Sequence, residues 1–274
     1  MFPNNVYPIK ISNTNKKYIE GLENIKDNIF INNKNKLKEY KKLWKINNNN
    51  TNIFLYLKNN NINKWTDTLR TIFWRINFMR KLSNNNKHLE VWIFPLNHKK
   101  TIPTNKILTE DNVNSGSTTI YYNRNDNGVI CLWRKEEILK VLIHEIIHSF
   151  NLDRNHPEPN EAYTELKACL INIYLELLER QIPLNNVNKY IDYEKLFSLE
   201  QKNKVCKCFN KNTNIKHYIN KKSDLLFQYY PNTVNNDNIW KINNNSLRFT
   251  ITEHILRNID KKDFNGKILN LHKE

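Results

Sequence analysis

The sequence predicts an α+β fold, in which a few short strands are followed by a series of helices. Three segments near the middle of the chain are short, rich in β-branched and aromatic residues and bounded by Asn, Gly or Pro: residues 88–95, 118–122 and 129–133. These features are typical of strands. An apolar, periodic segment beginning at Ile138 follows, and a second helical pattern runs from Asn160 to about Arg180. Strands followed by consecutive helices favour the α+β class.

The predicted elements fall into three parts of a chain of 274 residues. Residues 1–86 are mainly helical, with helices at 18–44 and 65–82 and a strand at 52–58 between them. Residues 87–182 hold the three strands, a helix starting at residues 134–137 with acidic residues in its first turn, and the long helix that Pro183 ends. Residues 183–274 are mainly helical, most clearly at 190–208 and 251–259. Asparagine tracts lie between the periodic segments, which predicts loops there.

The helix that begins near Ile138 carries His144, Glu145 and His148 in the pattern HExxH. Residues four apart lie on one face of a helix, so both imidazoles can bind one zinc ion. Glu145 is placed to act as the general base that takes a proton from zinc-bound water. The apolar residues at 138, 142 and 146 indicate a buried helix. The pattern therefore predicts a zinc site, and the alternative is a core helix with two hydrogen-bonded histidines.

A catalytic zinc site has three protein ligands and an open position for water, so a third ligand is needed. Residues 150–160 are rich in Asn, Asp and Pro, which predicts a loop, and Glu161 follows in the first turn of the next helix. Glu165 lies one turn further on the same face. Asp153 and His156 in the loop are the other candidates. A site with a third histidine six residues after His148 is excluded, because that residue is an arginine.

The combination of HExxH with Asn160-Glu161-x-x-x-Glu165 resembles the gluzincin superfamily of metallopeptidases, over about forty residues from 138 to 178. The resemblance implies a zincin-like fold: a small mixed sheet over the HExxH helix, with the mainly helical C-terminal part forming the floor of a cleft. It implies that Glu161 is the third zinc ligand and that Glu165 hydrogen-bonds a zinc-bound histidine. One departure is the spacing, since only twelve residues separate His148 from Glu161.

The resemblance also implies one catalytic Zn²⁺ and a protein or peptide substrate. An endopeptidase is favoured, because the Gly-Ala-Met-Glu-Asn element of the related aminopeptidases is absent. In this family an edge strand pairs with the substrate, and residues 114–119 are the candidate for it, with an ordinary hairpin loop as the alternative. The family stabilises the reacting carbonyl oxygen with a downstream histidine or tyrosine. Candidates are His217 and Tyr218, followed by Tyr229 and His254.

The formal net charge is +16 and the isoelectric point is near 9.5. Lys and Arg residues are scattered along the chain and match no nucleic-acid-binding motif. A solvated basic surface is one interpretation, since the abundance of Asn, Lys and Ile with only four glycines indicates AT-rich coding, as in some large DNA viruses, bacteria or protozoa. The other is attraction to nucleic acid or another acidic surface. The alternative to a peptidase is therefore an inactive zincin-like protein with a structural or nucleic-acid-associated role.

The location predicted from the sequence is intracellular and cytoplasmic, or the virion or infected-cell cytoplasm if the protein is viral. No apolar run is long enough for a transmembrane helix, and the first residues lack the pattern of a signal peptide. Four cysteines are few for a secreted protein of this size. Cys131 and Cys169 lie in apolar patterns and are predicted to be buried thiols, whereas Cys206 and Cys208 have no second pair to complete a zinc site.

Overall fold

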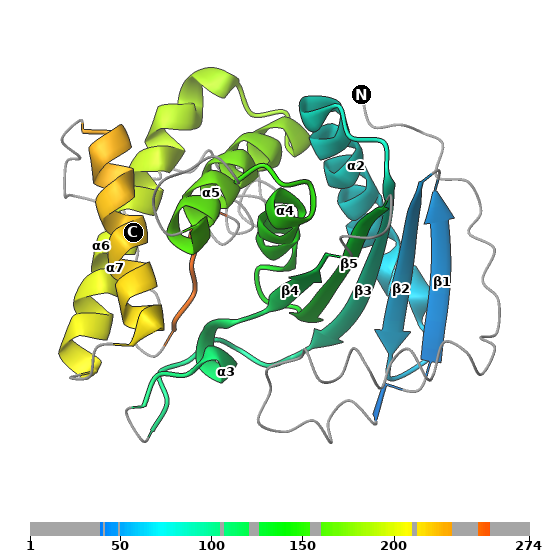
Figure 1. Cartoon of the computed structure of the whole chain (residues 1–274), viewed down its shortest axis with the longest axis horizontal. Coiled ribbons are helices and arrows are strands. Elements are labelled where there is room, and N and C mark those ends of the chain that lie inside the picture. The colour runs from blue at the N-terminus through cyan, green and yellow to red at the C-terminus, as the bar shows by residue number, and fades with distance from the viewer. Residues whose placement is uncertain are drawn as a thin grey trace, which may run out of the picture. The chain divides into compact units, whose positions relative to one another are not determined.

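A computed structural model describes residues 39–40, 42–48, 50–104, 107–120, 126–153, 160–209, 213–231 and 246–252. The chain divides into two compact units, the first made of Met1–Lys99 and Asn114–Asn155, the second of Lys100–Val113 and His156–Glu274. Strands lie in the first unit and helices dominate the second (Figure 1). The predicted α+β class is confirmed. The division into three parts stays a prediction.

The first unit is built on a small sheet of five strands in the order β1-β2-β3-β5-β4. Strands β2, β3 and β5 run parallel, and the outer strands β1 and β4 pair antiparallel with their neighbours, so the sheet is mixed. The strands are β1 (Lys42–Asn48), β2 (Thr51–Leu57), β3 (His88–Leu96), β4 (Gly116–Thr119) and β5 (Asp126–Arg134).

Strands β2, β3 and β5 lie where the sequence predicted strands, whereas β1 is a correction. A helix was expected to continue to residue 44, but Trp44 and Ile46 lie in β1 and pair with Leu55 and Ile53 of β2. Local helical periodicity is overridden here because the two strands form a hairpin through adjacent asparagines. Strand β4 spans 116–119 instead of 118–122, and residues 121–125 lie outside the described part of the chain.

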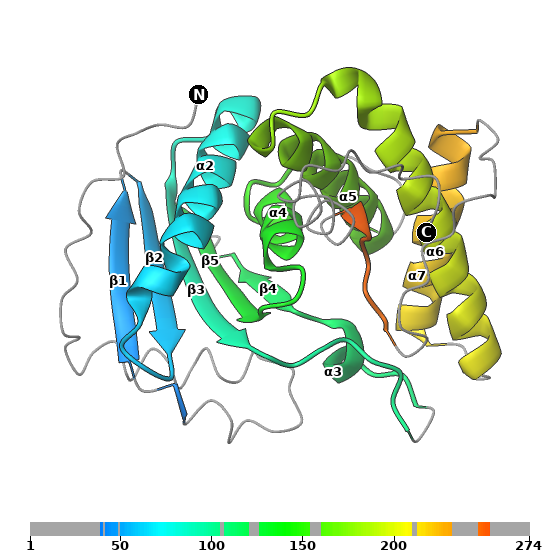
Figure 2. The same cartoon turned by 180° about the vertical axis from the view of Figure 1, so that it is seen from behind.

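Two helices, α2 (Thr66–Ser83) and α4 (Ile138–Ser149), lie beside the sheet in the first unit (Figures 1 and 2), and the short helix η2 (Ile62–Trp65) precedes α2. Helix α2 matches the predicted helix at 65–82. Helix α4 begins at Ile138, later than the predicted start at 134–137, because Glu137 has a left-handed backbone conformation (φ of 58°) that a helix cannot include. Its Arg80 guanidinium donates to the carbonyls of Asn85, Lys87 and Asn50 at 3.2, 2.6 and 3.0 Å. It also donates to the Thr51 hydroxyl at 3.1 Å. Arg80 therefore ties the end of α2 to the start of β2.

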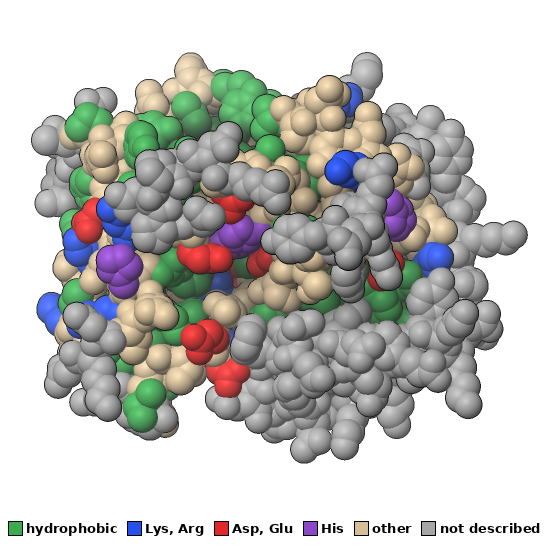
Figure 3. Space-filling model, in the orientation of Figure 1, with side chains coloured by type: hydrophobic (Ala, Val, Ile, Leu, Met, Phe, Trp, Pro, Cys, Tyr) green, Lys and Arg blue, Asp and Glu red, His purple; other side chains and the backbone are tan. Residues whose placement is uncertain are grey.

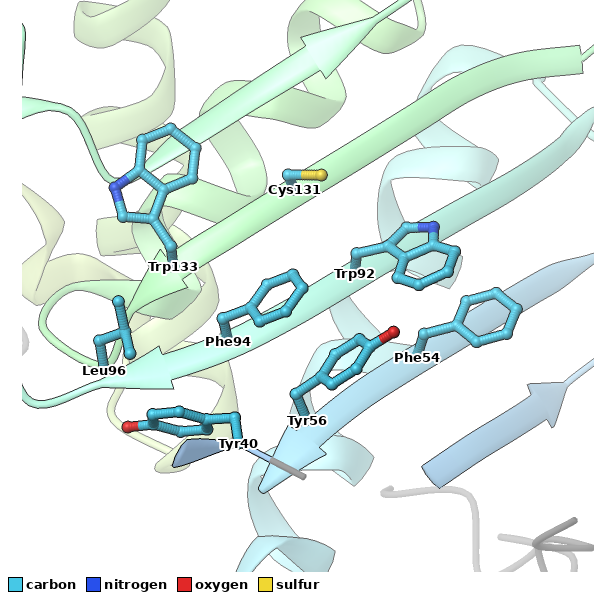
Figure 4. Packing of buried hydrophobic residues seen from close by; sticks show 8 residues of the cluster. All are labelled: Tyr40, Phe54, Tyr56, Trp92, Phe94, Leu96, Cys131 and Trp133. Carbon is cyan, nitrogen blue, oxygen red and sulfur yellow. The ribbon is translucent and has the colours of Figure 1, made fainter. Parts of the chain in front are cut away.

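The sheet face that points away from the two helices carries a cluster of stacked aromatic rings (Figure 4). Phe54 stacks on Trp92 with ring centroids 4.3 Å apart, and Tyr56 stacks on Phe94 at 4.4 Å. Neighbouring strands supply these pairs because every second residue of a strand points to the same face. Burial raises the pKa of the Tyr56 phenol and of the Cys131 thiol on this face. Cys131 is buried and free, as predicted.

The second unit contains three long helices: α5 (Asn160–Glu179), α6 (Val187–Cys208) and α7 (Asn214–Tyr229). Helices α6 and α7 pack on α5 and on each other. Short helices η3 (Leu184–Asn186) and α3 (Glu110–Val113) also belong to this unit. Helices α5 and α6 match the predicted segments, and only the first two residues of the predicted helix at 251–259 are described. No described helix is long and apolar enough to cross a membrane.

A buried carboxylate fastens residues 250–252 to α6. One oxygen of Glu194 accepts hydrogen bonds from both threonine hydroxyls of this segment, and from the amides of Ile251 and Thr252 at 2.9 and 3.0 Å. The segment that contains Thr250 and Thr252 is thereby held without regular secondary structure of its own.

Candidate metal centre

The first half of the centre is the pair of imidazoles on α4, which is buried on almost every side. The Nε2 atoms of His144 and His148 lie 3.2 Å apart, and the two rings meet edge to face. Two imidazole nitrogens bound to one tetrahedral zinc ion, each about 2.05 Å from it, lie about 3.3 Å apart. The imidazoles are therefore spaced as one zinc ion requires.

A carboxylate fixes the orientation of the second imidazole. Asp153 Oδ2 lies 2.6 Å from His148 Nδ1, and the aspartate side chain is 6% exposed. A carboxylate at this distance accepts a hydrogen bond from Nδ1, which leaves the lone pair of the neutral ring on Nε2. Sequence reasoning weighed Asp153 as a metal ligand, whereas the structure places it on the far side of the ring from Nε2.

The turn after α4 explains how Asp153 reaches this position. Asn151 adopts a left-handed backbone conformation, with φ of 63°. The amide of Leu152 donates to the carbonyl of Ile147 at 2.9 Å, and the amide of Asn151 donates to that of His148 at 3.0 Å. These two bonds form a Schellman motif, which reverses the chain at the end of a helix. The reversal returns Asp153 to the histidine five residues before it.

Glu145 lies between the two histidines in sequence and is 6% exposed. Its carboxylate contacts strand β4: the Thr118 hydroxyl donates a hydrogen bond to Oε2 at 2.8 Å. Strand β4 is at the edge of the sheet, as the sequence predicted for the substrate-binding rim. The contact between Thr118 and Glu145 joins residues 27 apart, so no local pattern in the sequence could have indicated it.

The second unit has its own group of acidic residues and a phenol near the start of α5. Glu161 is in the first turn of α5 and exposed, and Glu165, one turn later, is 1% exposed. The Tyr218 hydroxyl of α7 hydrogen-bonds Glu165. Burial raises the pKa of Tyr218 well above its ordinary value, and the charges of Glu165 and Glu161 raise it further. The phenol therefore keeps its proton and remains a hydrogen-bond donor at neutral pH.

The side chains predicted to stabilise the carbonyl oxygen differ in their burial and in their neighbours. Tyr218 lies beside Glu161 and Glu165, whereas His217 is exposed and Tyr229 is 51% exposed at the end of α7. His156 and His254 lie outside the described residues. The predicted bond from Glu165 to a zinc-bound histidine stays a prediction. The partners shown for Glu165 are Tyr218 and the Cys169 thiol, whose sulfur lies 3.7 Å from Oε1.

Comparisons with known proteins give no further guide to this centre. No protein-family model, no curated protein sequence and no solved structure matches the chain. A functional assignment therefore depends on the chemistry of the side chains themselves.

Proposed function

We propose that this protein is a zinc-dependent metallopeptidase of zincin-like architecture that acts as an endopeptidase. The observation that carries the proposal is the His144–His148 pair, with Nε2 atoms 3.2 Å apart and Asp153 directing the lone pair of His148 toward the same point. Two nitrogens at this spacing fit the tetrahedral ligands of one metal ion. A hydrogen bond between two core histidines would give the same spacing, and the HExxH pattern with Glu145 between them favours the metal site over that alternative.

Glu161 is the proposed third ligand. Glu161 lies in the first turn of α5 with its side chain exposed, and the Asn-Glu-x-x-x-Glu pattern after HExxH supports this role. Two imidazoles and one carboxylate are a common ligand set of catalytic zinc, and leave one position open. A bound zinc ion would supply Lewis acidity, polarising the peptide carbonyl and lowering the pKa of a water molecule toward neutrality.

The remaining steps belong to side chains of the protein. Glu145 accepts the proton of the attacking water and passes it to the leaving amine. Tyr218 turns its single O–H from Glu165 to the oxygen of the peptide carbonyl and donates a hydrogen bond as negative charge develops there. Its raised pKa suits this role, since only the protonated phenol can donate. Strand β4, at the sheet edge, is the proposed site for pairing with an extended peptide.

The alternative is an inactive protein of the same architecture that binds nucleic acid through its basic surface. The net charge of +16 supports attraction to phosphates. However, Lys and Arg side chains of described residues lie in small separate groups on the face in Figure 3, without one continuous patch. Retention of Glu145, which an inactive zinc-binding protein does not need, favours the peptidase.

Zinc content tests the ligand set. The wild type is expected to bind one zinc ion per chain, and His148→Ala and Glu161→Ala to lose it. The wild type is also expected to cleave a peptide library in a manner abolished by a chelator and restored by zinc, with cleavage sites read by mass spectrometry. Stoichiometric zinc binding without cleavage of any peptide would refute the proposed peptidase activity. Retention of zinc by Glu161→Ala would show that another residue is the third ligand.

A further inference from the structure

We propose that strand β4 positions the general base, with Thr118 holding one oxygen of the Glu145 carboxylate and Gly116 leaving the space that the other oxygen occupies. The proposal rests on the proposed peptidase function. It assigns to two residues outside the HExxH segment a role in catalysis that they exert through Glu145, apart from the main-chain pairing of β4 with substrate.

The first contact is a hydrogen bond from the edge strand to the base. The Thr118 Oγ1 atom lies 2.8 Å from Glu145 Oε2 and 3.0 Å from the main-chain oxygen of the same residue. The single hydroxyl proton is shared between a carboxylate and a helix carbonyl of one residue. A bond to a charged acceptor is the stronger of the two. Thr118 therefore fixes the rotation of the carboxylate relative to the backbone of α4.

The second contact depends on the lack of a side chain at residue 116. A Cβ atom placed on Gly116 would lie 2.7 Å from Glu145 Oε1, 2.9 Å from Glu145 Cγ and 2.7 Å from Val141 Cγ1. These distances are well inside van der Waals contact, so any larger residue would displace the glutamate or the helix. The glycine is needed here for space and not for its backbone freedom.

The strand is itself fixed in place, which makes it a suitable support. Thr118 and Gly116 are two residues apart and point to the same face, and they pair with Ile130 and Leu132 of β5. Just before β4, the amide of Trp133 donates to the carbonyl of Ser115 at 2.9 Å. The Arg134 guanidinium donates to the carbonyl of Asn114 at 2.8 Å. A strand anchored at its entry thus holds one oxygen of a flexible glutamate and leaves room for the other.

Replacement of Thr118 by valine tests the positioning role, because valine keeps the shape and removes the hydroxyl. Thr118→Val is expected to lower kcat roughly 10- to 100-fold, as loss of a hydrogen bond to a charged group predicts, with KM and zinc content unchanged. Thr118→Ser keeps the hydroxyl and is expected to retain most of kcat. Thr68→Val makes the same change on α2, outside the proposed site, and is the matched control that should leave kcat unchanged.

Gly116→Ala is the second variant, and should lower kcat because the added methyl group moves the carboxylate that Thr118 holds. If the wild type cleaves peptides with zinc while Thr118→Val keeps its full kcat, the positioning role is wrong and the peptidase stands. The role is also wrong if Thr118→Ser is as impaired as Thr118→Val, or if the loss of kcat follows a loss of zinc. A wild type that cleaves no peptide refutes the peptidase, and this role with it.

Discussion

At the scale of single residues, His148 is the best-defined group of the centre, because a partner lies beside each of its nitrogens. Asp153 holds Nδ1 at 2.6 Å, and Nε2 lies 3.2 Å from the corresponding atom of His144. A ring held in this way loses little freedom when it binds a metal ion, and its tautomer is already the one that ligation requires. The role of Asp153 is therefore to orient the ligand.

Replacement of Asp153 by asparagine separates an orienting residue from a ligand. Asp153→Asn is expected to weaken zinc binding by about 10- to 100-fold, the usual effect of losing such a partner, while the site still fills at high zinc concentration. Competition with a chromophoric chelator measures the affinity. Asp224→Asn, which changes an exposed acid of α7, is the control and should bind zinc like the wild type. Complete loss of zinc in Asp153→Asn, equal to that of His148→Ala, would instead make Asp153 a ligand.

The phenol of Tyr218 makes the second prediction at this scale. Tyr218→Phe is expected to lower kcat by roughly 10²- to 10³-fold with zinc content unchanged, as removal of one donor to a developing oxyanion predicts. Because burial raises its pKa above the ordinary value of 10.0, the phenol is protonated below that pH and loses its proton only at higher pH. Its contribution to kcat should therefore be constant from neutral pH to about pH 10. His217→Gln, at the neighbouring exposed residue, should have little effect on kcat. A large loss of kcat in His217→Gln, with none in Tyr218→Phe, would make His217 the donor to the carbonyl oxygen.

At the scale of elements, three of the described helices end with asparagine or glutamine where many proteins use glycine. Asn84, Asn151 and Gln181 adopt left-handed conformations, with φ of 50°, 63° and 56°. After each of α2, α4 and α5 an amide donates to the carbonyl five residues earlier, at 3.0, 2.9 and 2.9 Å. Asparagine tolerates this conformation better than most residues. A chain with only four glycines thus makes its helix ends from the residue it has in abundance.

The turn after α4 can be tested by two substitutions at Asn151. Asn151→Ala is expected to lower the free energy of unfolding by about 1 kcal/mol, because alanine is strained in the left-handed region. Asn151→Gly should be neutral or slightly stabilising. Urea unfolding measures both, with Asn203→Ala at an exposed position of α6 as the control. Since the turn delivers Asp153 to His148, only the alanine variant should also bind zinc more weakly. Equal stability of the two variants would show that the turn imposes no such strain.

At the scale of the whole molecule, the elements predicted best are those whose own periodicity matches their environment. Strands β2, β3 and β5 and helices α2, α5 and α6 have one strong pattern each, and the predicted and observed ranges overlap closely. Strand β1 was not predicted, because its first residues also fit a helical period. Pairing with β2 makes this segment a strand and not a helix. Helix α7 was not singled out, although its region was predicted to be mainly helical.

Some residues of the candidate metal centre can be predicted from local sequence, and others depend on contacts between distant segments. His144, Glu145 and His148 are fixed by helical spacing, so the sequence alone predicts that the imidazoles share a face. The partners of Glu145 come from β4, and the register of the sheet brings them to α4. Whether Asp153 binds a metal or a ring nitrogen is a matter of a few ångströms, which the motif does not encode.

The most direct test of a catalytic zinc centre is a comparison of wild type with Glu145→Gln in one peptide-hydrolysis assay, with zinc measured in the same samples. Both proteins are expected to hold one zinc ion per chain, because Glu145 is not a proposed ligand. Wild type should cleave the peptide, and Glu145→Gln should be slower by at least about 10²-fold, since the amide cannot accept the water proton. Equal cleavage by the two proteins, or zinc bound by both with cleavage by neither, would contradict a catalytic centre built on Glu145.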